Sequence, residues 1–275
     1  MLDNFIYENH LGIRFNGLEN GVYLNTNDLR DYTWSHQSIN GRISRFYRST
    51  TSRKLPLVVA CESDEVANAV RNKLLEIAEA DILARLPGKI YVGEYYTTGY
   101  ITGSAKTNYL IARRFCNITL TVTSDNPAWY REKTHVFVPT AGNVDFIGET
   151  EYPYDYPYDY AAVASGKKLN CDSIGNSAFK LLIYGSATNP EIVIGGHKYA
   201  INGTVGSGET LLINSLTKTI TLNTTDGRQI NWFDKRSRDS YIFEPLPSGK
   251  HDVMWVGTFG FNVTVIEERS EPKWT

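Results

Sequence analysis

The chain has 275 residues, 41% of them hydrophobic and 21% charged, and its formal net charge at pH 7 is −2. This is the composition of a globular protein, and it excludes a disordered chain. The balance of 28 basic and 30 acidic residues does not fit a protein whose whole surface binds nucleic acid. At about 150 residues per domain, the length indicates roughly two domains.

Three cysteines, Cys61, Cys116 and Cys171, are far apart in the sequence. They form neither a disulfide framework nor a zinc ligand set, so we expect reduced, buried thiols in a protein made in a reducing compartment. The first residues lack the basic and apolar regions of a signal peptide. The longest apolar run, at 57–61, is far too short to span a membrane, and no membrane partner is predicted.

The first 60 residues read as strands and turns, with the best strand candidates at 22–24 and 55–61. Asn40-Gly41 predicts a tight turn between them. Basic residues then recur at every third position over 42–48, a spacing that the period of a strand does not describe. We therefore predict a loop or a long hairpin arm for this segment.

One strong helix is predicted at about 63–85. Ser63 is suited to cap its N-terminus, and Asp64 and Glu65 follow in the first turn, where the helix dipole favours acids. The Leu-Pro-Gly run at 86–88 ends the helix, because proline disfavours helix in the residue before it. The face expected to pack on the core carries apolar residues spaced by four, four and three: Val66, Val70, Leu74 and Ile77.

The sequence after the helix reads as β-structure. Strands are predicted at 90–92 and within 109–122, a turn at 124–127, and loop-like sequence at 139–151. No second helical pattern follows.

From residue 165 onward, turns separate short strands about ten residues apart, which is typical of a β-sandwich. We expect an N-terminal domain over 1–138, a linker over 139–160 and a C-terminal domain over 161–275. The strands predicted in the C-terminal domain lie at 179–184, 192–194, 210–213, 219–222, 252–256 and 261–266.

A Tyr-Pro-Tyr-Asp repeat runs through residues 152–160. Its tyrosines could stack on sugar rings, and Asp155 and Asp159 could offer oxygen ligands to Ca²⁺, although the spacing is not that of an EF-hand. We favour a third interpretation, a stiff strap between domains, because the two prolines lower the entropy of the free chain. The candidate strap residues are Tyr152, Tyr154, Asp155, Tyr156, Tyr158, Asp159 and Tyr160.

Residues 41–54 contain five cations and no acid. Such a stretch could face nucleic acid, but arginine is also enriched where proteins contact one another. We favour a solvated hairpin arm or a subunit contact, and predict no specific nucleic-acid binding. The candidate subunit or channel surface consists of Arg42, Arg45, Arg48 and Arg53.

The sequence holds no complete motif for catalysis or cofactor binding. The phosphate-loop and dinucleotide patterns fail, and the five histidines lack the spacing of metal ligands. Asp234, Asp239 and Glu244 lie near Trp232 and could form the rim of a glycosidase site, but we favour a solvated charged loop. We therefore predict that the protein is not an enzyme, with no catalytic, cofactor-binding or metal-binding residues.

Several segments follow one another in an order more specific than any single motif. They are Leu86-Pro87-Gly88 after the helix, the run from Asp125 to Tyr130, the tyrosine repeat, the segments 192–196, 212–215 and 227–231, and the end Glu271-Pro272-Lys273-Trp274. This ordered set resembles the distal tail proteins (Dit) of long-tailed phages and related prophages of Gram-positive bacteria, over essentially the whole chain. This chain has Pro127-Ala128 where that family usually has a Pro-Tyr pair.

The resemblance implies a mainly β fold with one N-terminal α-helix: an N-terminal ring-forming β-sandwich and a C-terminal galectin-like β-sandwich. It implies a structural protein of the virion tail tip, made in the host bacterial cytoplasm. A homo-oligomeric ring, usually a hexamer, would join the tail tube protein to the tail-associated hub or lysin protein and often anchor a receptor-binding protein. No cofactor is implied, and no galectin sugar site maps onto residues 165–270.

Two further expectations follow. Tyrosine-rich stretches at 91–100 and Phe46-Tyr47 could supply the contacts of a ring, and a fragment without residues 161–275 is expected to fold and still form it. The alternative to a tail-hub protein is a monomeric carbohydrate-binding module that recognises cell-wall polysaccharide through Trp232 or the tyrosine repeat.

Overall fold

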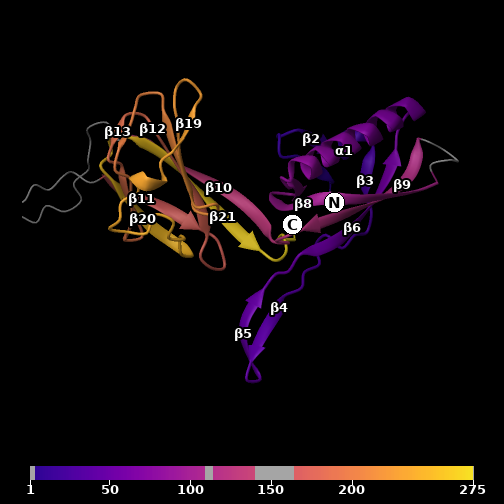
Figure 1. Cartoon of the computed structure of the whole chain (residues 1–275), viewed down its shortest axis with the longest axis horizontal. Helices are drawn as coiled ribbons and strands as arrows, with labels where there is room; N and C mark the ends of the chain where they lie inside the picture. Colours follow the sequence, from indigo (N-terminus) through magenta and orange to yellow (C-terminus); the bar gives the residue numbers. More distant parts are fainter. Residues whose placement is uncertain (1–3, 109–113, 140–163, 275) are drawn as a thin grey trace, which may run out of the picture. The chain divides into compact units, whose positions relative to one another are not determined.

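The computed structural model describes residues 4–108, 114–139 and 164–274 (Figure 1). The chain divides into two compact units: unit 1 comprises 1–131 and 268–275, and unit 2 comprises 132–267. The strands β10 (Trp129–Phe137) and β21 (Gly260–Arg269) carry the chain from one unit to the other.

These divisions differ from the boundaries predicted at 138 and 161. The last eight residues belong to unit 1 rather than to the C-terminal unit, because the Trp274 ring lies 4.2 Å from the Arg30 guanidinium and Trp34 Nε1 donates to Ser270 Oγ at 3.1 Å. Most of the predicted linker, and the whole tyrosine repeat within it, lies outside the described residues.

Unit 1 is built from two antiparallel sheets that share the long strand β8. The first part of β8, up to Gly99, pairs with β7, and the later part, from Tyr100, pairs with β9, with a register shift between Ile101 and Gly103. Such bulges bend a strand, and here β8 joins both sheets around one apolar core. The strands are β1 (Ile6–Glu8), β2 (Arg14–Asn16), β3 (Val22–Leu24), β4 (Ser35–Ile39), β5 (Arg42–Tyr47), β6 (Thr51–Ala60), β7 (Gly88–Val92), β8 (Tyr95–Thr107) and β9 (Phe115–Ser124).

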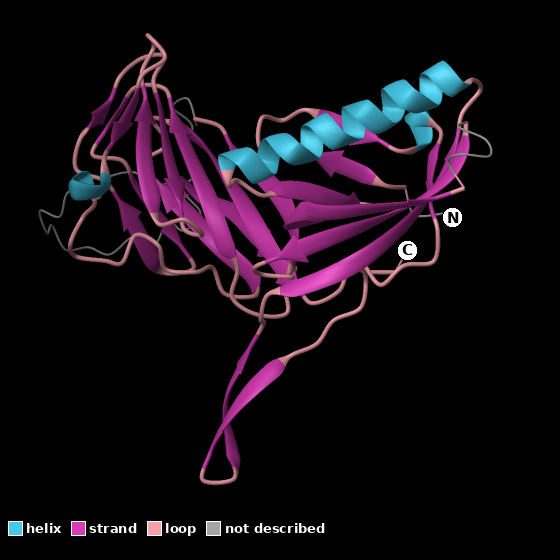
Figure 2. Cartoon of the chain, turned by 45° about the vertical axis from the view of Figure 1, so that its right-hand side comes forward, coloured by secondary structure: helices cyan, strands magenta, loops and turns pink. Residues whose placement is uncertain are grey.

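The predicted helix is confirmed as α1 (Asp64–Ala84), the one long helix drawn in Figure 2. Its N-cap is Ser63, whose side chain accepts the amide proton of Val66 at 3.2 Å. The prediction that Val66 packs on the core is wrong, since that side chain is 46% exposed. At about 100° per residue, Val66 falls at the margin of the buried stripe. The stripe consists of Ala67, Val70, Leu74, Ile77, Ala78 and Asp81.

Unit 2 is a sandwich of two antiparallel sheets, as the strand spacing predicts. One sheet has the order β19-β18-β17-β12-β21 and the other β11-β20-β14-β15. Alternate residues of each strand point inward, so the core collects side chains from both sheets, among them Trp255 and Phe261, whose ring centroids are 5.2 Å apart. The remaining strands are β11 (Ala164–Cys171), β12 (Ala178–Tyr184), β13 (Ala187–Thr188), β14 (Glu191–Ile194), β15 (His197–Ala200), β16 (Thr204–Val205), β17 (Thr210–Asn214), β18 (Thr219–Asn223), β19 (Gln229–Asn231) and β20 (Gly249–Trp255).

Candidate interaction surfaces

The hairpin β4–β5 is the most exposed element of unit 1. Asn40 and Gly41 both have positive φ, 51° and 74°, which is the geometry of the tight turn that Asn-Gly favours between two strands. Of the two structures predicted for this segment, the hairpin arm is therefore the one found. The two strands pair only with each other, every residue of β5 is exposed, and Figure 1 shows the hairpin standing away from the rest of unit 1.

The hairpin exposes large apolar side chains along its length: Ile39 at 58%, Ile43 at 53%, Phe46 at 58% and Tyr47 at 43%. An isolated two-stranded hairpin is marginally stable in water, and contiguous exposed apolar side chains mark sites of protein contact. The hairpin is therefore suited to pack against another molecule. The exposure of Phe46 and Tyr47 is compatible with the subunit contact predicted for them.

The four candidate arginines take three different environments. Arg42 and Arg45 lie on β5 and are exposed. Arg48 lies at the base of the hairpin, where its guanidinium is 4.3 Å from the centroid of the Trp34 ring and forms an ion pair with Glu268. The C-terminal segment thus holds the base of the hairpin in place.

Arg53 is buried, with only 6% of its surface exposed. It occupies an inward-facing position of β6, and its Nη2 donates to the carbonyl of Asp31 at 2.9 Å and to that of Pro127 at 3.4 Å. Burial lowers the pKa of the guanidinium, while Asp28 and Asp31 act to raise it. Arg53 thus links two backbone segments inside unit 1 through hydrogen bonds and is not part of its exposed surface.

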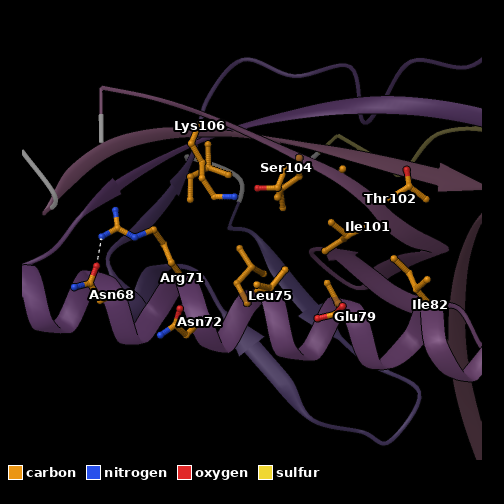
Figure 3. Close-up of a pocket in the computed structure, with 15 residues that line it drawn as sticks. Asn68, Arg71, Asn72, Leu75, Glu79, Ile82, Ile101, Thr102, Ser104 and Lys106 are labelled. Carbon is orange, nitrogen blue, oxygen red and sulfur yellow. Dashed lines mark hydrogen bonds between the residues drawn. The ribbon is translucent and has the colours of Figure 1, made fainter. Parts of the chain in front are cut away.

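A groove of about 600 Å³ lies between α1 and the strands β8 and β9 (Figure 3). Its floor is apolar, and on its helix side Leu75 and Ile82 are 56% and 42% exposed. Arg71 and Lys106 lie toward one end of the groove and Glu79 toward the other (Figure 3). The lining residues are Asn68, Arg71, Asn72, Leu74, Leu75, Ala78, Glu79, Ile82, Ile101, Thr102, Gly103, Ser104, Lys106, Ile118 and Leu120.

The groove arises because small side chains face each other across the helix–sheet contact. Ala78 on α1 and Gly103 and Ser104 on β8 leave space that larger side chains would fill. The sequence contains one signal for this site: Leu75 and Ile82 are seven residues apart on α1 but outside the face predicted to pack on the core. Sequence reasoning missed the groove because it followed only the stripe of Val70, Leu74 and Ile77.

A buried polar cluster joins the N-terminal strands of unit 1 to the end of α1. Asp81, fully buried, accepts hydrogen bonds from the Tyr7 hydroxyl and, at 2.9 Å, from the backbone amide of His10. Burial, then Asp81, raises the Tyr7 pKa above its ordinary value. A Cβ on Gly88 would overlap both the Tyr7 hydroxyl and the Asp81 carboxylate. Because its polar groups are paired and closed off, the cluster is part of the core packing.

The tyrosines at 91–100, which were predicted to contact neighbouring subunits, are less exposed than the aromatic residues of the hairpin, Phe46 and Tyr47. Tyr95 is 5% exposed, while the Tyr96 ring packs 5.7 Å from those of both Tyr91 and Tyr130. These rings pack against one another within unit 1.

The acids considered for a glycosidase rim lie in exposed positions of unit 2. Asp234 is in a one-turn helix, with an oxygen 3.9 Å from a nitrogen of Arg236, and Asp239 and Glu244 are also exposed. Trp232 is partly buried against the sandwich core, and a Cβ at Gly203 would lie only 3.0 Å from its ring. Its ring therefore takes part in the packing of the unit.

Within the described part of the chain, no three His, Cys, Asp or Glu side chains gather closely enough to hold a metal ion. Among the same residues, no helix combines the length and apolar character needed to cross a membrane. Among the surfaces described above, the exposed hairpin and the groove along α1 have the character of contact surfaces.

The sequence matches no protein-family model and no curated protein. Solved structures do match. The SPP1 Dit (gp 19.1) protein, described as a paradigm of the hub adsorption apparatus in phages that infect Gram-positive bacteria, aligns with a TM-score of 0.59 and 11% identity, covering 98% of this chain and 100% of that one.

Two structures of the phage P2 baseplate in its activated conformation, one with Ca and one with Sr, each contain a chain that aligns with a TM-score of 0.60 and 12% identity. These alignments cover 99% of this chain and 100% of the other. The present chain therefore has the fold of these phage hub and baseplate proteins over nearly its whole length.

Proposed function

We propose that this chain is the distal tail protein of a long-tailed phage. In this proposal it is a structural virion subunit that forms a ring of identical copies, six in the simplest case, at the tail tip. The ring joins the tail tube protein to the tail-associated hub protein and anchors the receptor-binding apparatus. The chain is made in the cytoplasm of the host bacterium and catalyses no reaction.

The whole-chain extent of the structural match carries this proposal. Both units, including the strands that connect them, align with hub and baseplate chains that are themselves covered completely. Proteins with many unrelated functions contain a single β-sandwich. A match over a whole chain of two units is shared by far fewer kinds of protein. The sequence resemblance, which rests on short segments along the chain, points to the same class of protein.

The exposed surface of unit 1 supports a role in assembly. A closed ring needs two different patches on each subunit, one fitting the other on the next copy. Unit 1 offers an apolar hairpin and an apolar groove on separate elements. We assign the ring to unit 1 and leave unit 2 outside it.

The proposal is tested by the mass of the purified full-length chain, measured by light scattering over a range of concentrations and followed by negative-stain imaging. We expect a particle of about six copies with an open centre. A chain that stays monomeric at every concentration and binds purified cell-wall polysaccharide would contradict the proposal and support the carbohydrate-binding alternative.

A further inference from the structure

We propose that the hairpin β4–β5 of one copy seats in the groove between α1 and β8–β9 of the next copy. This inference rests on the proposed function, because it names the contact that would close the ring. The occupant of the groove is thus a second copy of this chain.

The positions of the two surfaces make the contact intermolecular. Figures 1 and 2 both show the hairpin and α1 on opposite sides of unit 1, so the hairpin of one chain does not reach its own groove. Two different patches on opposite sides of a subunit produce a head-to-tail interface, and such an interface yields a ring when its rotation closes.

The two surfaces match in length and in apolar character. Strand β5 has six residues, which span about 17 Å from first to last at 3.3 Å per residue. The helix side of the groove runs from Asn68 to Ile82, about 21 Å at 1.5 Å per residue. Exposed apolar side chains occupy both surfaces over these lengths.

The charged side chains of the two surfaces are unevenly distributed. The hairpin carries Arg42 and Arg45 and no acid, whereas the groove is lined by one acid, Glu79, and two bases, Arg71 and Lys106. Arg71 and Lys106 lie toward one end of the groove, and Glu79 lies toward the other (Figure 3).

This distribution fixes the direction of docking. The tip of the hairpin, with Arg42, would lie toward Glu79, and the aromatic base, with Phe46, would lie toward the Arg71 guanidinium, which is itself held by Asn68 at 2.6 Å. Arginine over an aromatic face is a favourable contact.

Cysteine cross-linking of the full-length chain tests the contact directly. The three native thiols are buried, and burial raises the pKa of both Cys61 and Cys171, so their reaction is slow. One preparation carries Ile43→Cys in the hairpin and a second carries Ile82→Cys in the groove. Mixed and treated with a short bismaleimide, they are expected to yield covalent dimers, because the two positions then meet only between different molecules.

The matched control replaces Ile82→Cys by Lys73→Cys, which is exposed on the same helix but outside the groove. We expect little cross-linked dimer from that mixture. Equal yields from the two mixtures, or rings that form without any cross-link to Ile82→Cys, would overturn the docking while leaving the ring intact. A wild-type chain that never assembles would overturn the ring itself.

Charge reversal provides a second, independent test. Arg42→Glu and Glu79→Arg are each expected to raise the concentration at half assembly by about 3–10-fold, as expected for one exposed ion pair. The double variant restores the attraction in reverse and should assemble close to the wild-type concentration. Additive losses in the double variant would contradict the proposed orientation.

Discussion

Both units are β-sandwiches, but they differ in how they leave apolar side chains exposed. In unit 1, the hairpin β4–β5 and the helix α1 each expose four large apolar side chains, while others, such as Leu11 and Phe115, lie elsewhere in the unit. In unit 2, exposed side chains such as Ile174, Leu216 and Met254 come singly from separate turns and strands. Single exposed apolar side chains are normal on any protein, whereas gathered ones indicate contact. The difference supports our proposal that unit 1 makes the contacts between copies.

The interiors of the units differ as well. The core of unit 2 is centred on packed aromatic rings, while unit 1 also buries the polar cluster around Asp81. Packing deletions should therefore act most strongly in unit 2, and hydrogen-bond deletions in unit 1.

The largest expected effect is in the aromatic core of unit 2. Trp255→Ala removes a ring that packs on Phe137 and Phe261 and donates to the carbonyl of Phe259 at 3.0 Å. It should cost about 3–5 kcal/mol and lower only the calorimetric transition of unit 2. Met254→Ala, at the neighbouring exposed position, is the control. A single transition that moves as a whole would show that the two units unfold together.

The next largest effect concerns the buried cluster of unit 1. Asp81→Ala leaves the Tyr7 hydroxyl and the His10 amide without their acceptor, at a cost of about 2–4 kcal/mol. Chemical denaturation of the full-length chain should show a lowered midpoint for unit 1. Glu76→Ala, an exposed change on the same helix, should leave that midpoint in place. If both variants had the same small effect, the cluster would contribute little to stability.

Alkaline pH should weaken both units. Burial raises the pKa of Cys171 in unit 2 from 9.0 to about 11, and burial followed by Glu268 raises that of Tyr130 in unit 1 from 10.0 to about 12. Because each pKa is higher in the folded state, each contribution to stability is complete below the unfolded value and is lost as pH rises through the folded value.

Both units should therefore begin to lose stability near pH 9, since burial also raises the pKa of Cys61 in unit 1 from 9.0. The loss in unit 1 should steepen above pH 10 as Tyr130 begins to titrate, and Cys171 and Tyr130 each contribute on the order of 2–3 kcal/mol when fully titrated. Denaturation midpoints measured from pH 8 to pH 12 test these onsets. Cys171→Val should move the onset in unit 2 to higher pH, and an unchanged onset would exclude this thiol as its cause.

The smallest expected effect is at the base of the hairpin. Arg48→Ala removes the ion pair to Glu268 and the contact with the Trp34 ring, for about 0.5–1.5 kcal/mol. The global midpoint should hardly move, but trypsin should cut the hairpin at Arg42 and Arg45 faster. Arg228→Ala, which removes the exposed pair with Asp226 in unit 2, is the control. An unchanged rate of cleavage would mean that the C-terminal segment does not hold the hairpin.

Local patterns in the sequence predict the helix and the strands, but not which of their side chains are buried and which are exposed. The cap at Ser63 and the apolar spacing predict α1 to within a residue or two, and Asn40-Gly41 predicts the turn of the hairpin. Strand β8 was not predicted, because its threonines and glycines give no clear alternation of polar and apolar residues. Arg53 was predicted on a surface but is buried. Its side chain points inward because β6 pairs with β3 and β9, and this pairing is not visible in the local sequence.

By itself, the sequence determined a mainly β protein with one helix, a C-terminal sandwich and an acid-free basic segment. These features follow from local periodicity, capping and turn preferences, which act over a few residues. Only the tertiary structure decided that residues 268–275 belong to unit 1 and that Arg48 forms an ion pair with Glu268. It also decided that Leu75 and Ile82 line a groove. Each of these depends on contacts between residues far apart in the chain, and such contacts form only when the sheets pack.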